Sequence, residues 1–236
     1  SWPPGRADEI RELARRDRAR RAWIRSSRCL RDCSDFVAET ATARRRGFAP
    51  PAAGDGVVLA RGRRSRVVRL GPVVAKHYLR AGAPAGLRRL LPALRPAARA
   101  FRRLHLLELE GLPAARPLAW TGDVVWTSWV EGREAAASDL PALAAWLRRL
   151  HDRGHGLRDA KAANFRMTSD GPVLIDADGI TPARLRPARD LGRLAAEAGD
   201  ADCLEALLAA YGRHEEAAVE RWRLRFRRLL AAAPGG

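Results

Sequence analysis

The pattern of hydrophobic and polar positions changes along the 236-residue chain, and the first quarter differs from the rest. Residues 7–33 are strongly charged, with apolar residues at loosely helical spacing, which predicts a helix with ill-defined ends. Residues 44–56 are rich in Gly, Pro and Ala, a composition typical of a linker. We therefore expect residues 1–56 to form a basic helical extension followed by a linker.

Short runs of β-branched residues come next. Three such runs predict strands at 57–60, 66–70 and 73–78, and two further runs, at 116–120 and 123–130, predict two more. The first three are separated by a few turn residues only, so we expect them to form an antiparallel meander. Between the third and fourth runs, the apolar spacing predicts a helix from about residue 97 to residue 110, ended by Gly111.

The second half of the chain has mainly helical periodicity. Four leucines form a stripe at helical spacing: Leu140, Leu143, Leu147 and Leu150. Ser138 or Asp139 is expected to cap this helix, and Gly154 to end it. Two short strands are predicted at 164–167 and 172–176, around a Ser-Asp-Gly turn. The remaining predicted helices lie at 187–198, 200–211 and 214–231.

The composition is that of a globular protein, with 47% hydrophobic and 30% charged residues. The net charge of +17 indicates anionic partners, although an arginine-rich coding bias alone produces the same charge. Nucleic acid is not expected among these partners, because the basic residues are not interleaved with aromatic residues and match no known module. Cys29, Cys33 and Cys203 fit neither a disulfide framework nor a metal site, and they favour a reducing cytoplasm. We find no apolar run long enough to span a membrane and no secretory signal.

Two rare residue types draw attention to one stretch of the second half. Among 44 basic residues only Lys76 and Lys161 are lysines, and Asn164 is the one asparagine. Lys161 and Asn164 belong to the spacing D-x-K-x-x-N, which begins at Asp159 between a predicted helix and a predicted hairpin. Asp176 follows twelve residues after Asn164, at the end of an apolar strand, while Lys76 lies in the third predicted strand. In a chain whose coding bias favours arginine, a lysine indicates a position that needs a compact, flexible ammonium group.

This set resembles the catalytic set of protein kinases, and the chemistry explains each residue type. Lys76 is expected to contact the nucleotide phosphates, and Lys161 the phosphoryl group in transfer. Asp159 is expected to orient the acceptor hydroxyl and to receive its proton. Asn164 and Asp176 offer the oxygen ligands that Mg²⁺ prefers. The predicted cofactors are therefore ATP and Mg²⁺.

The order of the elements is also similar to that of the protein-kinase-like fold. This resemblance implies an α+β, two-lobed fold, with a small antiparallel-sheet N-lobe at 57–130 and a mostly helical C-lobe at 131–236. Ser128 and Val130, at the end of the last predicted N-lobe strand, are assigned with Lys76 to nucleotide binding.

Several phrases between residues 57 and 200 resemble the bacterial lipopolysaccharide core kinases, the Kdo/heptose (WaaP-like) family. They are "RVVRLGPVVAKHY", "LELEGLPAARPLAW", "LRRLHDRGHGLRDAKAANFRM", "VLIDADGI" and "RPARDLGRL". The resemblance implies transfer of phosphate from ATP to an inner-core sugar at the cytoplasmic face of the inner membrane. It also implies that Asp190, in "RDLGRL", supports the catalytic loop rather than touching substrate.

The chain departs from this pattern in its first lobe. Residues 59–67 contain a single glycine where a phosphate-binding loop is glycine-rich. No acidic residue lies between His77 and Leu107, and the glutamate that pairs with the strand lysine would fall near Ala100. Glu108 and Glu110 come late on the predicted helix, so we expect neither to pair with Lys76. A catalytically impaired, kinase-like scaffold in envelope biosynthesis is therefore one alternative function.

The acceptor is expected to be a small molecule or a glycan. Only thirteen residues separate Asp176 from Asp190, too few for the segment on which protein kinases dock a peptide. The expected partners are a nucleotide and an anionic glycolipid or sugar. A phosphotransferase for another small hydroxylated molecule, such as an aminoglycoside-type compound, is the alternative enzyme.

The C-terminal segment, 215–233, predicts an amphipathic helix. Trp222, Phe226, Leu229 and Leu230 share one face, and Arg221, Arg225 and Arg228 flank another. The apolar face either packs on the second lobe or lies on an anionic membrane surface, with the arginines toward the lipid headgroups. Peripheral contact with an anionic membrane is thus a further expected interaction.

Overall fold

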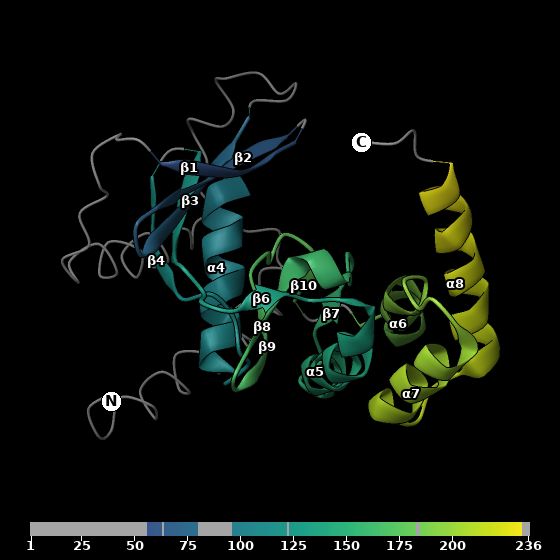
Figure 1. Cartoon of the computed structure of the whole chain (residues 1–236). Helices are drawn as coiled ribbons and strands as arrows, with labels where there is room; N and C mark the ends of the chain where they lie inside the picture. Colours follow the sequence, from purple (N-terminus) through teal and green to yellow (C-terminus); the bar gives the residue numbers. More distant parts are fainter. Residues whose placement is uncertain (1–55, 63, 80–95, 122, 183–184, 233–236) are drawn as a thin grey trace, which may run out of the picture. The chain divides into compact units, whose positions relative to one another are not determined.

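The computed structural model describes residues 56–62, 64–79, 96–121, 123–182 and 185–232. These residues divide into two compact units, coloured along the sequence in Figure 1. One unit contains the described residues up to Gly111 together with Arg116–Trp129, and the other contains Leu112–Ala115 together with the residues from Val130 onward. The predicted extension and linker lie outside the described residues except for Gly56, and so do Cys29 and Cys33.

An antiparallel sheet forms the first unit. Its strands are β1 (Val57–Arg61), β2 (Ser65–Leu70), β3 (Val73–Tyr78), β4 (Pro117–Thr121) and β5 (Val124–Ser128). They are ordered β1-β2-β3-β5-β4. The predicted meander of three strands is confirmed, and Gly71 supplies the positive φ of 59° that the tight turn between β2 and β3 requires.

One helix, α4 (Pro96–Leu109), packs along one face of this sheet (Figure 1). Its residues Ala97, Ala100 and Phe101 form a core cluster with Val125 of β5. On the other face of the sheet, Ala75, Ala119 and Trp126 form a second cluster. The small alanines on α4 allow the helix backbone to lie close to the strands.

The second unit is mainly helical. Its helices are α5 (Leu140–Asp152), α6 (Pro187–Ala195), α7 (Ala201–Tyr211) and α8 (Glu216–Ala231). Its strands are β6 (Arg133–Glu134), β7 (Gly156–Leu157), β8 (Phe165–Thr168), β9 (Gly171–Leu174) and β10 (Ile180–Thr181). They form a three-stranded sheet in the order β6-β8-β9 and a separate pair of β7 with β10. The helical leucine stripe on α5 is buried, as its spacing predicts.

The helix α5 begins without the side-chain cap that was predicted at Ser138 or Asp139. Asp139 stands at the N-cap position, but its carboxylate accepts no hydrogen bond from the helix backbone. The carboxylate instead accepts hydrogen bonds from both terminal nitrogens of Arg133, at 2.6 and 2.7 Å, and from the backbone N–H of Ala136 at 2.8 Å. The guanidinium of Arg133 offers two charge-assisted hydrogen bonds where a cap contact offers one, so the carboxylate turns away from the helix. The guanidinium of Arg133 is the first cause that holds the pKa of Asp139 below its ordinary value.

The C-terminal helix α8 packs on α6 (Figure 1). Gly192 of α6 permits this contact, because a Cβ at that position would lie 2.6 Å from the Cβ of Trp222 and 2.8 Å from the carbonyl oxygen of Val219. Trp222 and Phe226 are half-buried, while Leu229 and Leu230 are 58% and 47% exposed. The apolar face of α8 is therefore covered in its middle and open at its C-terminal end. Among the described residues, no helix combines the length and hydropathy required to cross a lipid bilayer.

Candidate active site

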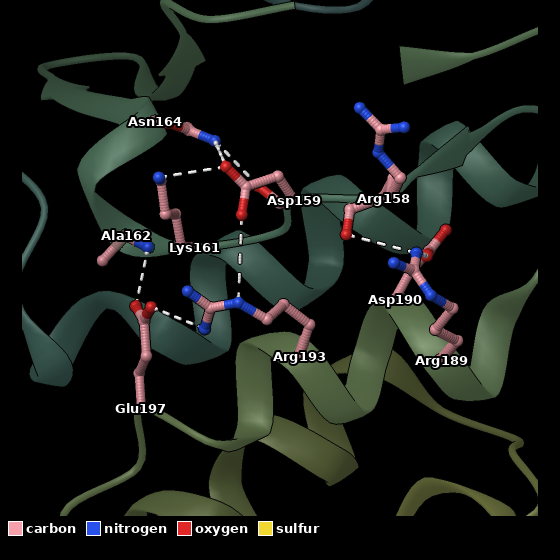
Figure 2. Close-up of polar contacts among 9 residues, drawn as sticks. All are labelled: Arg158, Asp159, Lys161, Ala162, Asn164, Arg189, Asp190, Arg193 and Glu197. Carbon is pink, nitrogen blue, oxygen red and sulfur yellow. Dashed lines mark hydrogen bonds and ion pairs between the residues drawn. The ribbon is translucent and has the colours of Figure 1, made fainter. Parts of the chain in front are cut away.

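The second unit brings Asp159, Lys161 and Asn164 together in one loop after β7 (Figure 2). The Nζ of Lys161 lies 3.0 Å from Oδ2 of Asp159. The side-chain amide of Asn164 donates to the backbone carbonyl of Asp159 at 2.8 Å and reaches its Oδ2 at 3.4 Å. The three residues of the D-x-K-x-x-N spacing are therefore linked to one another, with the Asp159 carboxylate at the centre.

The surroundings of Asp159 favour its ionised form. Partial burial is the largest single influence and raises the pKa of this carboxyl, but the hydrogen bond and positive charge of Lys161, the hydrogen bond of Asn164 and the charge of Arg193 together outweigh it. The net result is a pKa below the ordinary value. Asp159 is thus a carboxylate at neutral pH, the form that can accept a hydrogen bond from a hydroxyl.

Asp190 of α6 anchors the chain just before this loop. Its side chain is buried, and its Oδ2 accepts a hydrogen bond from the backbone N–H of Leu157 at 2.8 Å. The terminal nitrogen of Arg189 lies 3.1 Å from Oδ1 of Asp190 and donates to the carbonyl of Arg158 at 3.2 Å (Figure 2). Asp190 thus fixes the backbone that leads into the loop, while support of a catalytic loop stays a prediction.

A buried histidine extends the anchor toward α7. The Nε2 of His151 lies 3.5 Å from Oδ2 of Asp190, and its Nδ1 lies 2.6 Å from the hydroxyl of Tyr211. Burial raises the pKa of Tyr211 to about 12, so its hydroxyl keeps its proton at neutral pH and can donate it to Nδ1. Tyr211 and Asp190 therefore lie at the two nitrogens of the same buried ring.

Asp176 lies in a turn that backbone contacts hold against the same loop. The N–H of Ile175 donates to the carbonyl of Asn164 at 2.8 Å, and the N–H of Asp178 donates to Oδ1 of Asp176 at 3.0 Å. Gly179 completes the turn, since a Cβ there would lie 3.0 Å from the backbone nitrogen of Asp159. The hairpin between β8 and β9 therefore places Asp176 beside the segment that carries Asn164.

These two residues suit a hard cation, since both carry oxygen ligands. In the described part of the chain, no cluster of three or more His, Cys, Asp or Glu side chains is arranged to hold a metal. A magnesium ion bound by Asn164 and Asp176 would therefore need further oxygen ligands from nucleotide phosphates and water, which is how Mg²⁺ usually binds in nucleotide-dependent enzymes.

Lys76 belongs to the other unit and lies on β3, opposite Val67 of β2 and Val125 of β5. Its Nζ lies 5.4 Å from the ring centroid of Tyr78, two residues along on the same face of the strand. Val125 packs on Ala100 of α4, which is 3% exposed. Ala100, near which the sequence predicted the paired glutamate to be missing, is therefore a small core residue.

The two other nucleotide candidates lie at the end of β5. The hydroxyl of Ser128 accepts a hydrogen bond from the N–H of Arg116 at 3.2 Å, and the N–H of Ser128 donates to the carbonyl of Arg116 at 2.9 Å. Val130 is the first residue of the second unit after this strand. The backbone N–H of Ser128 is thus used within the sheet, and nucleotide contact at both residues stays a prediction.

Glu108 has partners of its own within the first unit. Its Oε2 lies 3.1 Å from Nδ1 of His105, and its Oε1 lies 3.9 Å from Nε of Arg116. Eight residues of helix separate it from Ala100, a rise on the order of 12 Å. Glu110 follows the last helical residue of α4, beside Gly111.

Replacing Glu108 or Glu110 with Gln is therefore expected to change nucleotide affinity by less than about twofold. The physical reason is that the Glu108 carboxylate already contacts His105 and Arg116, and that Glu110 lies past the last residue of α4. Titration calorimetry with ATP and Mg²⁺ on each variant measures the effect. A loss of about tenfold, or about 1.4 kcal/mol, at either position would show that this glutamate acts on the nucleotide site.

Two residues that contact the loop were not predicted from the sequence. Arg193 of α6 lies 3.9 Å from Oδ1 of Asp159, and Glu197, in the turn after α6, accepts a hydrogen bond from the N–H of Ala162 at 2.8 Å. One signal was available, because Arg193 and Glu197 fall three and seven residues after Asp190 and so share its helical face.

Comparison with known proteins identifies the fold. No protein-family model and no curated protein matches the chain. Among solved structures, the ADP-bound aminoglycoside phosphotransferase APH(2'')-Ib is similar, with a TM-score of 0.55, 13% identity, and coverage of 80% of this chain and 86% of that one. A choline/ethanolamine kinase family protein from Mesorhizobium loti is similar with a TM-score of 0.53 and 18% identity, over 78% of this chain and 80% of that one.

A third similar structure is the streptomycin–ATP ternary complex of APH(2'')-IIa, with a TM-score of 0.53 and 11% identity, over 75% of this chain and 88% of that one. At these identities the likeness concerns the fold. The chain has the α+β protein-kinase-like fold, shared with phosphotransferases that act on small molecules, and the predicted fold class is confirmed.

Proposed function

We propose that this protein is an ATP-dependent phosphotransferase that adds phosphate to a sugar hydroxyl of a lipopolysaccharide inner core. The observation that carries the proposal is the loop of the second unit, where Lys161 and Asn164 hold the Asp159 carboxylate within a kinase-like fold. A carboxylate held ionised by one cation and one amide is suited to orient a hydroxyl for attack on a phosphoryl group.

Each candidate residue has one role in this proposal. Asp159 accepts a hydrogen bond from the acceptor hydroxyl and takes its proton as the oxygen attacks. Lys161 balances the negative charge of the phosphoryl group in transfer. Asn164 and Asp176 would hold Mg²⁺, which neutralises phosphate charge when bound. Lys76 positions the nucleotide phosphates, and Ser128 and Val130 contribute to nucleotide binding.

The choice of a sugar acceptor rests on the sequence and on charge. The phrases that resemble lipopolysaccharide core kinases include the proposed catalytic loop and the "RDLGRL" segment, whose Asp190 accepts the N–H of Leu157 just before that loop. The short segment between Asp176 and Asp190 leaves little chain for docking a peptide. The net charge of +17 suits an acceptor that already carries phosphate or carboxylate groups. We place the reaction in the cytoplasm, at the inner face of the inner membrane.

Phosphate analysis of the core oligosaccharide tests this function in cells. Material from cells with the intact gene is compared with material from cells that lack it, and with cells complemented by Asp159→Asn. We expect one phosphate on an inner-core sugar to be lost in the deletion strain and not restored by the variant. Identical phosphate content in all strains would remove lipopolysaccharide as the acceptor.

A second candidate is phosphorylation of a small hydroxylated molecule of the aminoglycoside type. It is favoured by the likeness to the two aminoglycoside phosphotransferase structures, one of which is a complex with streptomycin and ATP. Purified protein incubated with ATP, Mg²⁺ and either an aminoglycoside panel or deacylated core oligosaccharide separates the two candidates by which acceptor gains a phosphoryl group.

The third candidate, a catalytically impaired scaffold, is favoured by Ala100 in the core of the first unit. It differs from both enzymes because such a scaffold transfers no phosphate and needs no catalytic metal site. Calorimetry with ATP and Mg²⁺ on the wild type and on Asp176→Ala addresses it directly. A catalytic metal site predicts that the variant loses magnesium-dependent affinity, whereas a scaffold without such a site predicts no difference.

Peripheral membrane contact through α8 is a further part of the proposal. Leu229 and Leu230 are exposed at the end of the helix, and Arg221, Arg225 and Arg228 are exposed on the same helix. Each arginine near an anionic surface adds roughly 1 kcal/mol. We therefore expect the protein to sediment with anionic liposomes at low salt, and binding to fall sharply when all three arginines are changed to Gln.

Two comparisons make the membrane test decisive. Neutral liposomes are the matched control for charge, and high salt is the control for electrostatic attraction. If binding is insensitive to salt, or is unaffected by the triple change, α8 does not attach the protein to the membrane.

A further inference from the structure

Beside the loop of the candidate site lie two residues that have no role in the reaction proposed above. Arg193 is 8% exposed, and its Nη1 donates to Oε1 of Glu197 at 2.9 Å. The other oxygen of Glu197 accepts the N–H of Ala162 at 2.8 Å. Figure 2 shows the two side chains side by side beneath the loop, Arg193 reaching toward Asp159 and Glu197 toward Ala162.

The pair therefore meets the loop at two separate points. The guanidinium of Arg193 stands 3.9 Å from Oδ1 of Asp159, on the opposite carboxylate oxygen from Lys161. Glu197 binds the backbone at the start of the short turn Ala162–Asn164, which carries Asn164. Arg193 thus contacts the proposed base, and Glu197 contacts the turn that carries the proposed magnesium ligand.

Neighbouring contacts fix the pair in turn. The ring centroid of Phe226 on α8 lies 5.6 Å from the guanidinium carbon of Arg193 and 5.8 Å from that of Arg189. Arg189 itself holds the carbonyl of Arg158. Both arginines that reach the loop from α6 therefore lie over one aromatic ring of the C-terminal helix, at distances typical of cation–π contacts. A guanidinium with a carboxylate on one side and a ring on another has little freedom to move.

Direct contact with substrate does not account for this arrangement, because a side chain that is 8% exposed offers almost no surface to a ligand. We propose that Arg193 and Glu197 are positioning residues, which form a clamp that holds residues 159–164 in the geometry needed for phosphoryl transfer. The clamp rests on the proposed function for its role in the reaction, whereas its structural part, the restraint of the loop, stands on the contacts alone. Positioning matters because a displacement of about 1 Å in a catalytic group reduces rate by up to about a hundredfold.

The test compares two changes at Glu197. Glu197→Gln keeps an oxygen that can accept the Ala162 N–H, whereas Glu197→Leu removes the acceptor and leaves a side chain of similar size. Asp152→Leu is the matched control, because Asp152 forms the same kind of i,i+4 contact with Arg148 on the exposed side of α5, at 2.8 Å. Amide hydrogen exchange of the full-length protein, followed by NMR, reports the protection of Ala162 directly.

We expect the Ala162 amide to exchange at least about tenfold faster in Glu197→Leu, and at nearly the wild-type rate in Glu197→Gln and in Asp152→Leu. In steady-state assays, kcat of Glu197→Leu should fall on the order of tenfold to a hundredfold while KM for ATP changes less than about twofold. Arg193→Met should likewise lower kcat and leave KM for ATP nearly unchanged. Arg193→Lys should have a higher kcat than Arg193→Met.

Different results would contradict the proposed function and the proposed clamp. If the wild type transfers no phosphate to any acceptor, the proposed function fails, and the exchange rate of Ala162 still measures the clamp. If Ala162 keeps its protection in Glu197→Leu, the clamp is wrong whatever the activity. If protection is lost while kcat stays at the wild-type value, the pair is an ordinary structural contact without a positioning role.

Discussion

Changing Asp159 to Asn is expected to reduce the rate of phosphoryl transfer on the order of a hundredfold to ten-thousandfold, the range for loss of a general base. The substitution keeps the size of the side chain and an oxygen that the Asn164 amide can donate to. It removes the charge that Lys161 balances at 3.0 Å and the group that takes the proton from the acceptor. The loss should therefore appear in kcat and not in the affinity for ATP.

Asp170→Asn is the matched control for this change. Asp170 is an exposed carboxylate in the turn between β8 and β9, and we expect its variant to keep the wild-type kcat. Coupled-enzyme detection of ADP, with calorimetry of ATP binding in parallel, provides both quantities. If Asp159→Asn retained more than about a tenth of the activity, another group would have to serve as the base.

The largest expected effect on stability is at Asp190. Its carboxylate is 1% exposed and accepts the N–H of Leu157, while Arg189 lies 3.1 Å from its other oxygen. Asp190→Ala leaves a buried N–H and a partly buried guanidinium without their carboxylate. Breaking a buried, hydrogen-bonded charge pair in this way costs about 3–5 kcal/mol.

Urea unfolding followed by tryptophan fluorescence measures this change in the free energy of unfolding. Asp190→Asn, which keeps an acceptor oxygen for Leu157, should lose clearly less than Asp190→Ala, and the exposed Asp202→Ala should stay within about 0.5 kcal/mol of the wild type. A decrease of less than about 1 kcal/mol for Asp190→Ala would show that Asp190 does not anchor the loop.

Much of the fold was predictable because long elements carry a periodic signal. The leucine stripe of α5 is buried as its spacing indicates, and the short apolar runs form the five predicted strands β1 to β5. Strands of two residues, such as β6, β7 and β10, have no periodicity to detect and were missed. Asp139 shows a further limit, because its choice of Arg133 over the helix backbone depends on a strand pairing that the local sequence does not encode.

The candidate site was predictable where its residues lie close together in the sequence, and not where its contacts join distant residues. Residue type and spacing identify Asp159, Lys161 and Asn164, since the chemistry demands those groups, and the structure joins them within a few residues of chain. Arg193 and Glu197 act through contacts across some thirty residues, which only the packing of α6 beneath the loop creates. The convergence of Lys76 with Asp159 and Asp176 in one cleft stays a prediction from the sequence.

The most direct measurement of the central claim follows the γ-phosphoryl group itself. Purified protein is incubated with γ-labelled ATP, Mg²⁺ and deacylated lipopolysaccharide core oligosaccharide, and the label is located by chromatography and mass spectrometry. The account predicts label on a sugar hydroxyl of the oligosaccharide with the wild type, and none above background with Asp159→Asn or after chelation of the metal. Label that remains in ATP although the nucleotide binds, or equal transfer by the wild type and Asp159→Asn, would contradict it.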